Sequence, residues 1–79
     1  MDPIEVKARF DLSGKVTPLS FTWQGREYLV EGTGRRWQAQ DGLHLLVMAA
    51  GEKVFELVYI ALEGRWFIQP RSLVTKWMA

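Results

Sequence analysis

The chain begins with a segment in which apolar and polar side chains alternate. Apolar residues occupy every second position from Ile4 to Phe10, and charged residues fill the positions between them. A period of two is typical of a β-strand with one buried face and one face in water. The turn residues that follow end at Gly14 and predict a second strand over 15–23. Pro18 lacks a backbone N–H, so we expect it at a sheet edge or a bulge.

Gln24-Gly25 has the length and the glycine of a two-residue hairpin turn. A hairpin closed by this turn has a fixed register and predicts three facing pairs on one face of the sheet. These pairs are Trp23 with Arg26, Phe21 with Tyr28, and Leu19 with Val30. Residues 31–42 then break the alternation and contain two early glycines, so we expect a loop or a bulge there, with Trp37 in a short strand inside it.

Two further turns divide the apolar sequence that follows into three strands. Gly51-Glu52 is predicted to join a strand over 43–50 to one over 53–60, and Glu63-Gly64 to join the second to a third. The resulting pairs are His44 with Tyr59, Leu45 with Val58, Val47 with Glu56, Tyr59 with Ile68, and Ile60 with Phe67. In this register His44 and Glu56 point to opposite faces, and both faces of the sheet are apolar.

A sheet that is apolar on both faces must be covered on both. Three groups could cover the second face: the first hairpin curling over to close a barrel, the tail over 72–78, or a second copy of the chain. The tail after Pro70 fits one or two helical turns with Ser72 as the N-cap, and a further strand is the alternative. We therefore expect a mainly β fold. It is a single domain over residues 1–79, an antiparallel meander of five to seven strands curled into a small open barrel.

Composition limits the function classes. The 79 residues are 48% apolar and contain no cysteine and one histidine, which excludes a disulfide framework and the common closed zinc sites. The net charge of +1 gives no overall field that would attract nucleic acid or an anionic membrane. No apolar run approaches the length of about 18 residues that spans a bilayer. We expect a cytoplasmic protein without metal, cofactor or membrane contact, stabilised by self-association, most simply as a homodimer through the apolar sheet face.

Few residues are candidates for chemistry. His44 lies among leucines with no nucleophile near it in sequence, so a hydrogen-bonded structural role is favoured over that of a catalytic base. Glu56 stands between two apolar residues and is expected at a rim or paired with an arginine. The segment Gly32-Thr33-Gly34-Arg35-Arg36 resembles part of a phosphate-binding loop, but β-like sequence follows it where such loops lead into a helix. We predict no catalytic residue and no enzyme.

Basic residues repeatedly adjoin tryptophans in this chain. The candidate binding residues are Trp23, Arg26, Arg35, Arg36, Trp37, Arg65 and Trp66, and Arg71, Lys76 and Trp77 extend the pattern into the tail. Small β-barrels bind single-stranded nucleic acid with aromatic rings beside cations, but tryptophan is equally common in protein cores. The leading interpretation is a non-enzymatic binding or assembly module, for another protein or for itself. Single-stranded nucleic-acid binding is the alternative.

The order of these motifs resembles a family of small bacterial domains of unknown function. The pattern F-x-W-x-G-R-x-Y-x-V of that family is matched by residues 21–30, and its later tryptophan by Trp37. An aromatic-Glu-Leu strand at 55–57 and a closing Gly-x-Trp at 64–66 complete the match, which covers most of the chain. The resemblance implies a compact β fold and no established activity, so no functional residues are carried over from it.

Overall fold

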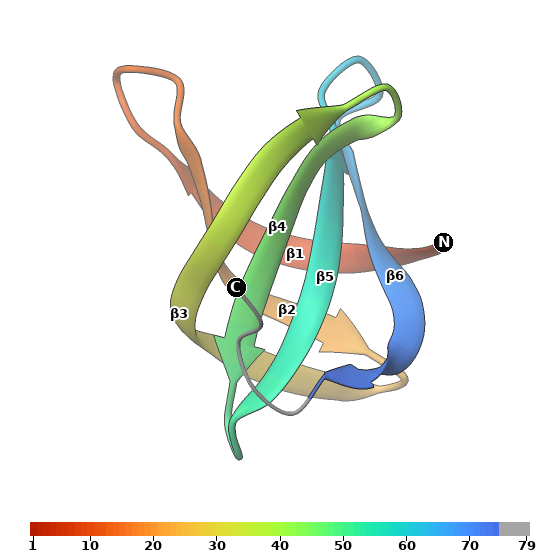
Figure 1. The fold of residues 1–79 in the computed structure, drawn as a ribbon. Helices are drawn as coiled ribbons and strands as arrows, with labels where there is room; N and C mark the ends of the chain where they lie inside the picture. Colours follow the sequence, from red (N-terminus) through yellow and green to blue (C-terminus); the bar gives the residue numbers. More distant parts are fainter. Residues whose placement is uncertain (75–79) are drawn as a thin grey trace.

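The computed structural model describes residues 1–74 of the chain, with side chains as far as Gln69. Six antiparallel strands follow one another in the order β1 (Asp2–Phe10), β2 (Val16–Trp23), β3 (Arg26–Ala39), β4 (Gly42–Ala49), β5 (Lys53–Ile60) and β6 (Arg65–Val74). Each strand pairs with the next, and β6 returns to β1, so the sheet closes into a barrel (Figure 1). Three pairs make this closure: Asp2 with Ile68, Pro3 with Phe67, and Ile4 with Trp66. The prediction of a small, mainly β antiparallel barrel is confirmed, except that the barrel is closed where the sequence analysis expected an open one.

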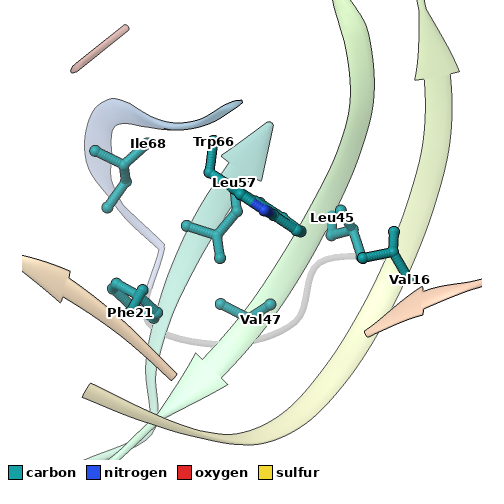
Figure 2. Packing of buried hydrophobic residues seen from close by; sticks show 7 residues of the cluster. All are labelled: Val16, Phe21, Leu45, Val47, Leu57, Trp66 and Ile68. Atoms are coloured by element: carbon teal, nitrogen blue, oxygen red, sulfur yellow. The ribbon is translucent and has the colours of Figure 1, made fainter. Parts of the chain in front are cut away.

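The barrel interior holds the hydrophobic core. Seven buried side chains form it, and Figure 2 shows them pointing inward from several strands: Val16, Phe21, Leu45, Val47, Leu57, Trp66 and Ile68. Half-buried aromatic rings extend the core, since Phe21 lies 5.2 Å from the Tyr28 ring and 5.1 Å from the Phe55 ring. Each fully buried side chain of this size contributes roughly 1.5–3 kcal/mol to folding. Packing inside the barrel is therefore the main source of its stability.

The β2–β3 hairpin forms as the sequence predicts. Gln24 and Gly25 both have positive φ, as a two-residue turn of this kind requires, and Trp23 pairs with Arg26 and Phe21 with Tyr28. The predicted register is thus confirmed, but the pairing ends at Ser20 with Leu29 and does not extend to Leu19 and Val30. The register of β2 against β1 slips beside Pro18, which leaves Leu19 as the extra, exposed residue of a bulge.

Strand β3 is continuous where the sequence suggested a loop or a bulge. It runs for 14 residues, and two irregularities in its pairing with β4 absorb the glycine-rich stretch: one between Val30 and Gly32, the other between Thr33 and Arg36. The bulge alternative was right, and the loop was wrong. The first part of β3 pairs with β2 and the rest with β4. Beyond the last β2–β3 pair, Arg36 Nη1 donates a hydrogen bond to the Val16 carbonyl oxygen at 3.0 Å, so a side chain continues the link between the two strands.

The β4–β5 register differs by one residue from the prediction. Leu45 faces Leu57 and Leu46 faces Glu56, because the turn contains three residues, 50–52, and not two. A shift of one residue exchanges the faces of a strand, so His44 and Glu56 lie on the same face and not on opposite ones. The hydrophobic pattern could not reveal the error, because both faces of these strands are apolar.

The β5–β6 register is shifted by two residues from the prediction. Ile60 pairs with Arg65, and Tyr59 with Trp66, across the four-residue turn 61–64. The Ile60 carbonyl oxygen accepts hydrogen bonds from the amides of Glu63 and Gly64, which stabilises this longer turn. The predicted pairs of Ile60 with Phe67 and Tyr59 with Ile68 are wrong, but an even shift keeps the side chains of β6 on the predicted face relative to β5.

Strand β6 continues through Val74, which pairs with Val54. Residues 72–74 therefore belong to a strand, and the helical alternative is wrong for them. The rest of the predicted tail element, 75–78, lies outside the described residues.

Candidate functional site

The tryptophans proposed as binding residues are placed in different surroundings. Trp66 is buried in the core, and half-buried Trp23 packs edge-on against Phe55, with ring centroids 5.9 Å apart. Trp37 lies on the outer wall of the barrel, where it pairs with His44 of β4. Two of the seven candidate residues are thus core aromatics, and their rings are largely used in packing.

The candidate arginines are dispersed along β3 and at the start of β6. Three guanidinium groups lie over aromatic rings: Arg26 over Tyr28 at 5.9 Å, Arg35 over Trp37 at 5.4 Å, and Arg65 over Phe67 at 5.2 Å. The fourth, Arg36, is bound to a backbone carbonyl of β2. The structure therefore brings together Trp23 with Arg26 and Arg35 with Trp37, but it does not gather all seven residues at one site.

The outer wall carries a charged cluster that the sequence did not predict, and two of its three residues are buried. His44 Nδ1 lies 2.6 Å from Glu56 Oε2, and His44 Nε2 lies 2.7 Å from Asp41 Oδ1. Only 8% of His44 and 6% of Glu56 are exposed, although both face away from the barrel interior. The Trp37 ring stacks on the imidazole at 5.2 Å and 23°. We call Asp41, His44 and Glu56 the His44 clamp.

The β3–β4 turn places Asp41 for this contact. Gly42 follows Asp41 and has a φ of 144°, and a Cβ atom at this position would lie 2.6 Å from the Tyr59 carbonyl oxygen. Only glycine fits so close to β5, and its conformation brings the turn back against the wall. Asp41 can then reach the histidine three residues later.

The clamp favours the charged form of the imidazole. Burial lowers the pKa of His44, but hydrogen bonds and charges from Asp41 and Glu56 outweigh burial and leave the pKa raised above 6.5. The hydrogen bond from His44 in turn lowers the pKa of Asp41 below 3.8. In the imidazolium form both ring N–H groups donate to a carboxylate, so neither nitrogen is free to take a proton from a substrate.

The side chains of the His44 clamp are not arranged to bind a metal ion. The two carboxylates bind opposite nitrogens of one ring, so their oxygens do not converge on a common point with either nitrogen. Within residues 1–74, no group of three or more His, Cys, Asp or Glu side chains is placed to hold a metal ion. The clamp is therefore a set of mutual hydrogen bonds between side chains.

The β1–β2 hairpin carries a second, exposed carboxylate network. Asp11 Oδ1 accepts hydrogen bonds from the Ser13 amide at 2.9 Å, the Ser13 hydroxyl at 2.7 Å and the Lys15 amide at 2.9 Å. The Asp11 backbone also bonds to Lys15 and Gly14. These contacts, with the Ser13 hydroxyl the largest contribution, lower the pKa of Asp11. The tip of the hairpin is thus held in one backbone conformation.

This tip presents apolar side chains to solvent. Leu12 is 108% exposed and Phe10 is 56% exposed, while the Phe10 and Tyr59 rings make a T-shaped contact with 5.7 Å between their centroids. An open concavity of about 450 Å³ is lined by Arg9, Phe10, Asp11, Leu12 and Ser13. Figure 1 shows the hairpin projecting from the barrel at the end that also bears the β3–β4 and β5–β6 turns. We call these five residues the hairpin tip.

Other exposed apolar side chains are more isolated. Leu62 is fully exposed in the β5–β6 turn, at the same end of the barrel as the hairpin tip. Leu19 and Leu29 are exposed on β2 and β3. The concavity described above is lined by none of these three residues. At the hairpin tip, by contrast, an exposed leucine, a second apolar side chain and a concave surface lie together.

Comparison with known protein families, with curated proteins and with solved structures gives no match for this chain. The resemblance of residues 21–30 to a bacterial domain family therefore stays a prediction. No helix among residues 1–74 is long and apolar enough to cross a membrane.

Proposed function

We propose that the chain is a non-enzymatic assembly module that binds a protein partner through the hairpin tip. One observation carries this proposal: the fully exposed Leu12 stands on a backbone already fixed by the hydrogen bonds of Asp11. A rigid apolar anchor loses little conformational entropy on binding, and a few such anchors supply most of the energy of protein interfaces. A leucine exposed in this way gains more from a partner than from water.

The outer wall of the barrel offers a partner less exposed apolar surface than the hairpin tip does. Val58, His44 and Glu56 are already buried within the single chain, on the face of the sheet that points away from the barrel interior. A partner that docked over them would remove little further apolar surface from water. The tip is the better candidate for the interface because its apolar surface is still in contact with solvent.

The ring contacts give less support to nucleic-acid binding. Base stacking needs a free aromatic face, whereas Trp37 contacts both His44 and Arg35, and Trp66 is in the core. The arginines at Trp37 and Phe67 still offer cations on the outer wall. Quenching of tryptophan fluorescence by single-stranded oligonucleotides at low salt would favour this second function, and the quenching should weaken steeply as salt is added.

The test of the proposed function is site-specific photocrosslinking in cells that express the chain. A photoreactive residue in place of Leu12 should give a covalent protein adduct, and the same residue in place of Leu62 should give much less. Adding Phe10→Ser should reduce the Leu12 adduct, because the partner then loses the second apolar contact. Equal crosslinking from both positions, or an adduct that nuclease removes, would contradict a protein-binding tip.

A further inference from the structure

We infer that the partner of the hairpin tip is a second copy of this chain, related by a two-fold axis that sets Leu12 of each copy into the concavity of the other. This inference rests on the proposed function and names its partner. It follows from the fact that the tip contains both a protrusion and a hollow. In a two-fold dimer the same surface patch of both copies forms the contact, so the patch must be complementary to its own copy. A patch with both a protrusion and a hollow can meet this condition.

The apolar parts of the tip are suited to such a contact. Leu12 is fully exposed, and the half-exposed Phe10 lines the same open concavity. The concavity, about 450 Å³, has room for a leucine side chain. Because Phe10 is held against Tyr59 and the backbone is held by Asp11, both surfaces exist before association. Little ordering is needed when two copies meet.

The charges of the tip are also self-complementary. Arg9 and Asp11 flank Phe10, and among the described residues Arg9 forms no ion pair. All three side-chain hydrogen bonds of Asp11 go to Oδ1, so Oδ2 is left for a group from outside the hairpin. A two-fold axis near Leu12 would bring Arg9 of one copy to Asp11 of the other, twice over. An unrelated partner would need to supply both charges in the same order.

The size of the tip limits the strength of this dimer. Stable interfaces bury about 1,200–2,000 Å² in total, and two hairpin tips of five residues each bury less. We therefore expect a weak dimer that dissociates on dilution and whose population rises with concentration. A small contact also means that a single substitution at its centre should have a large effect on the association constant.

Sedimentation equilibrium of the purified chain tests the inference. The weight-average mass should rise from that of the monomer toward twice that value as protein concentration is raised to the millimolar range. Leu12→Asp should weaken association at least tenfold, because it brings two carboxylates together across the axis. Leu62→Asp is the matched control, since Leu62 is equally exposed on another turn, and it should leave association unchanged.

Two results would overturn the inference: a chain that stays monomeric throughout, or a dimer that Leu12→Asp and Leu62→Asp weaken equally. A monomer that still gives a Leu12 crosslink to a different protein would end the two-fold dimer but leave the proposed function standing. Absence of any Leu12 crosslink would end both.

A single introduced thiol supplies a second measurement. The chain contains no cysteine, so Leu12→Cys places one reactive group at the proposed axis. Under mild oxidation it should form disulfide-linked dimers several times faster than Leu62→Cys, and dilution should remove the difference. Equal rates from the two positions would show that the tips do not meet specifically.

Discussion

Glu56 and Asp11 are both carboxylates that accept short hydrogen bonds, but they lie in opposite surroundings. Glu56 is buried in the outer wall, where it binds a histidine from the neighbouring strand. Asp11 is exposed at a hairpin tip, where its partners are two and four residues away in sequence. In the wall, hydrogen bonding compensates for buried charge. At the tip it fixes a backbone and leaves the adjacent leucine exposed.

The two carboxylates therefore contribute to different properties, Glu56 to the stability of the fold and Asp11 to binding. A buried charged pair is costly to break, because the remaining charge has neither its partner nor water. An exposed network is replaced by water when it is lost, so its removal costs much less. We therefore expect substitutions in the His44 clamp to affect folding, and substitutions at the hairpin tip to affect association.

The largest expected effect comes from Glu56→Ala. Removing this carboxylate leaves the histidine buried with one partner fewer, and we expect a loss of about 3 kcal/mol in the free energy of unfolding. Urea denaturation followed by circular dichroism measures it. The double variant His44→Leu/Glu56→Leu should lose less than the two single variants together, because neither of these two buried groups is then left without the other. A loss below about 1 kcal/mol for Glu56→Ala, the range of an exposed ion pair, would show that the wall and the tip do not differ in this respect.

The pH dependence of stability should show the clamp as well. Because the pKa of His44 is raised in the folded state, its contribution is fully present below pH 6.5 and is lost as the pH rises through the folded value. Asp41 has a lowered pKa, so its contribution is present above pH 3.8 and is lost as the pH falls through its folded value. Thermal unfolding should therefore show maximal stability between these limits. His44→Gln should remove the decrease on the alkaline side, and an unchanged alkaline limb in that variant would assign the decrease to another group.

The smallest expected effects are at the hairpin tip. Asp11→Ala removes three hydrogen bonds in an exposed turn, where water replaces them, and should lower the free energy of unfolding only slightly. Leu12→Ala should change the free energy of unfolding by less than about 0.5 kcal/mol, because the side chain packs on nothing in the single chain. Chemical denaturation at a concentration where the chain is monomeric measures both. A larger effect from Leu12 than from Asp11 would mean that the leucine has a folding role.

The fold could be predicted from the sequence where one face of a strand is polar. The alternation from Ile4 to Phe10 predicted β1, and Gln24-Gly25 predicted the β2–β3 register. The glycines at the centre of β3 suggested an interruption because they are also common in loops, whereas here they accompany bulges within a paired strand.

The candidate sites were harder to predict, for two physical reasons. The His44 clamp depends on a register that the apolar pattern could not determine, since β4 and β5 are apolar on both faces. The single available signal was a glutamate within an apolar strand, which we expected at a rim or paired with an arginine, whereas the structure buries it beside His44. At the tip, the Asp11-Leu12-Ser13-Gly14 sequence predicted a turn, and aspartate often accepts hydrogen bonds from amides two residues on. Exposure of Leu12 is a property of the folded surface and has no such local signal.

The register between β4 and β5 also bears on how the chain avoids misfolding. A slip of one residue would exchange one apolar face for another and cost little in hydrophobic burial, so the barrel has a competing fold close in energy. Such a slip would move either His44 or Glu56 into the apolar interior without the other. The charges of the pair would thus exclude a fold that the hydrophobic residues alone would tolerate. On this view, two leucines in their place would give a barrel that is still compact but no longer unique.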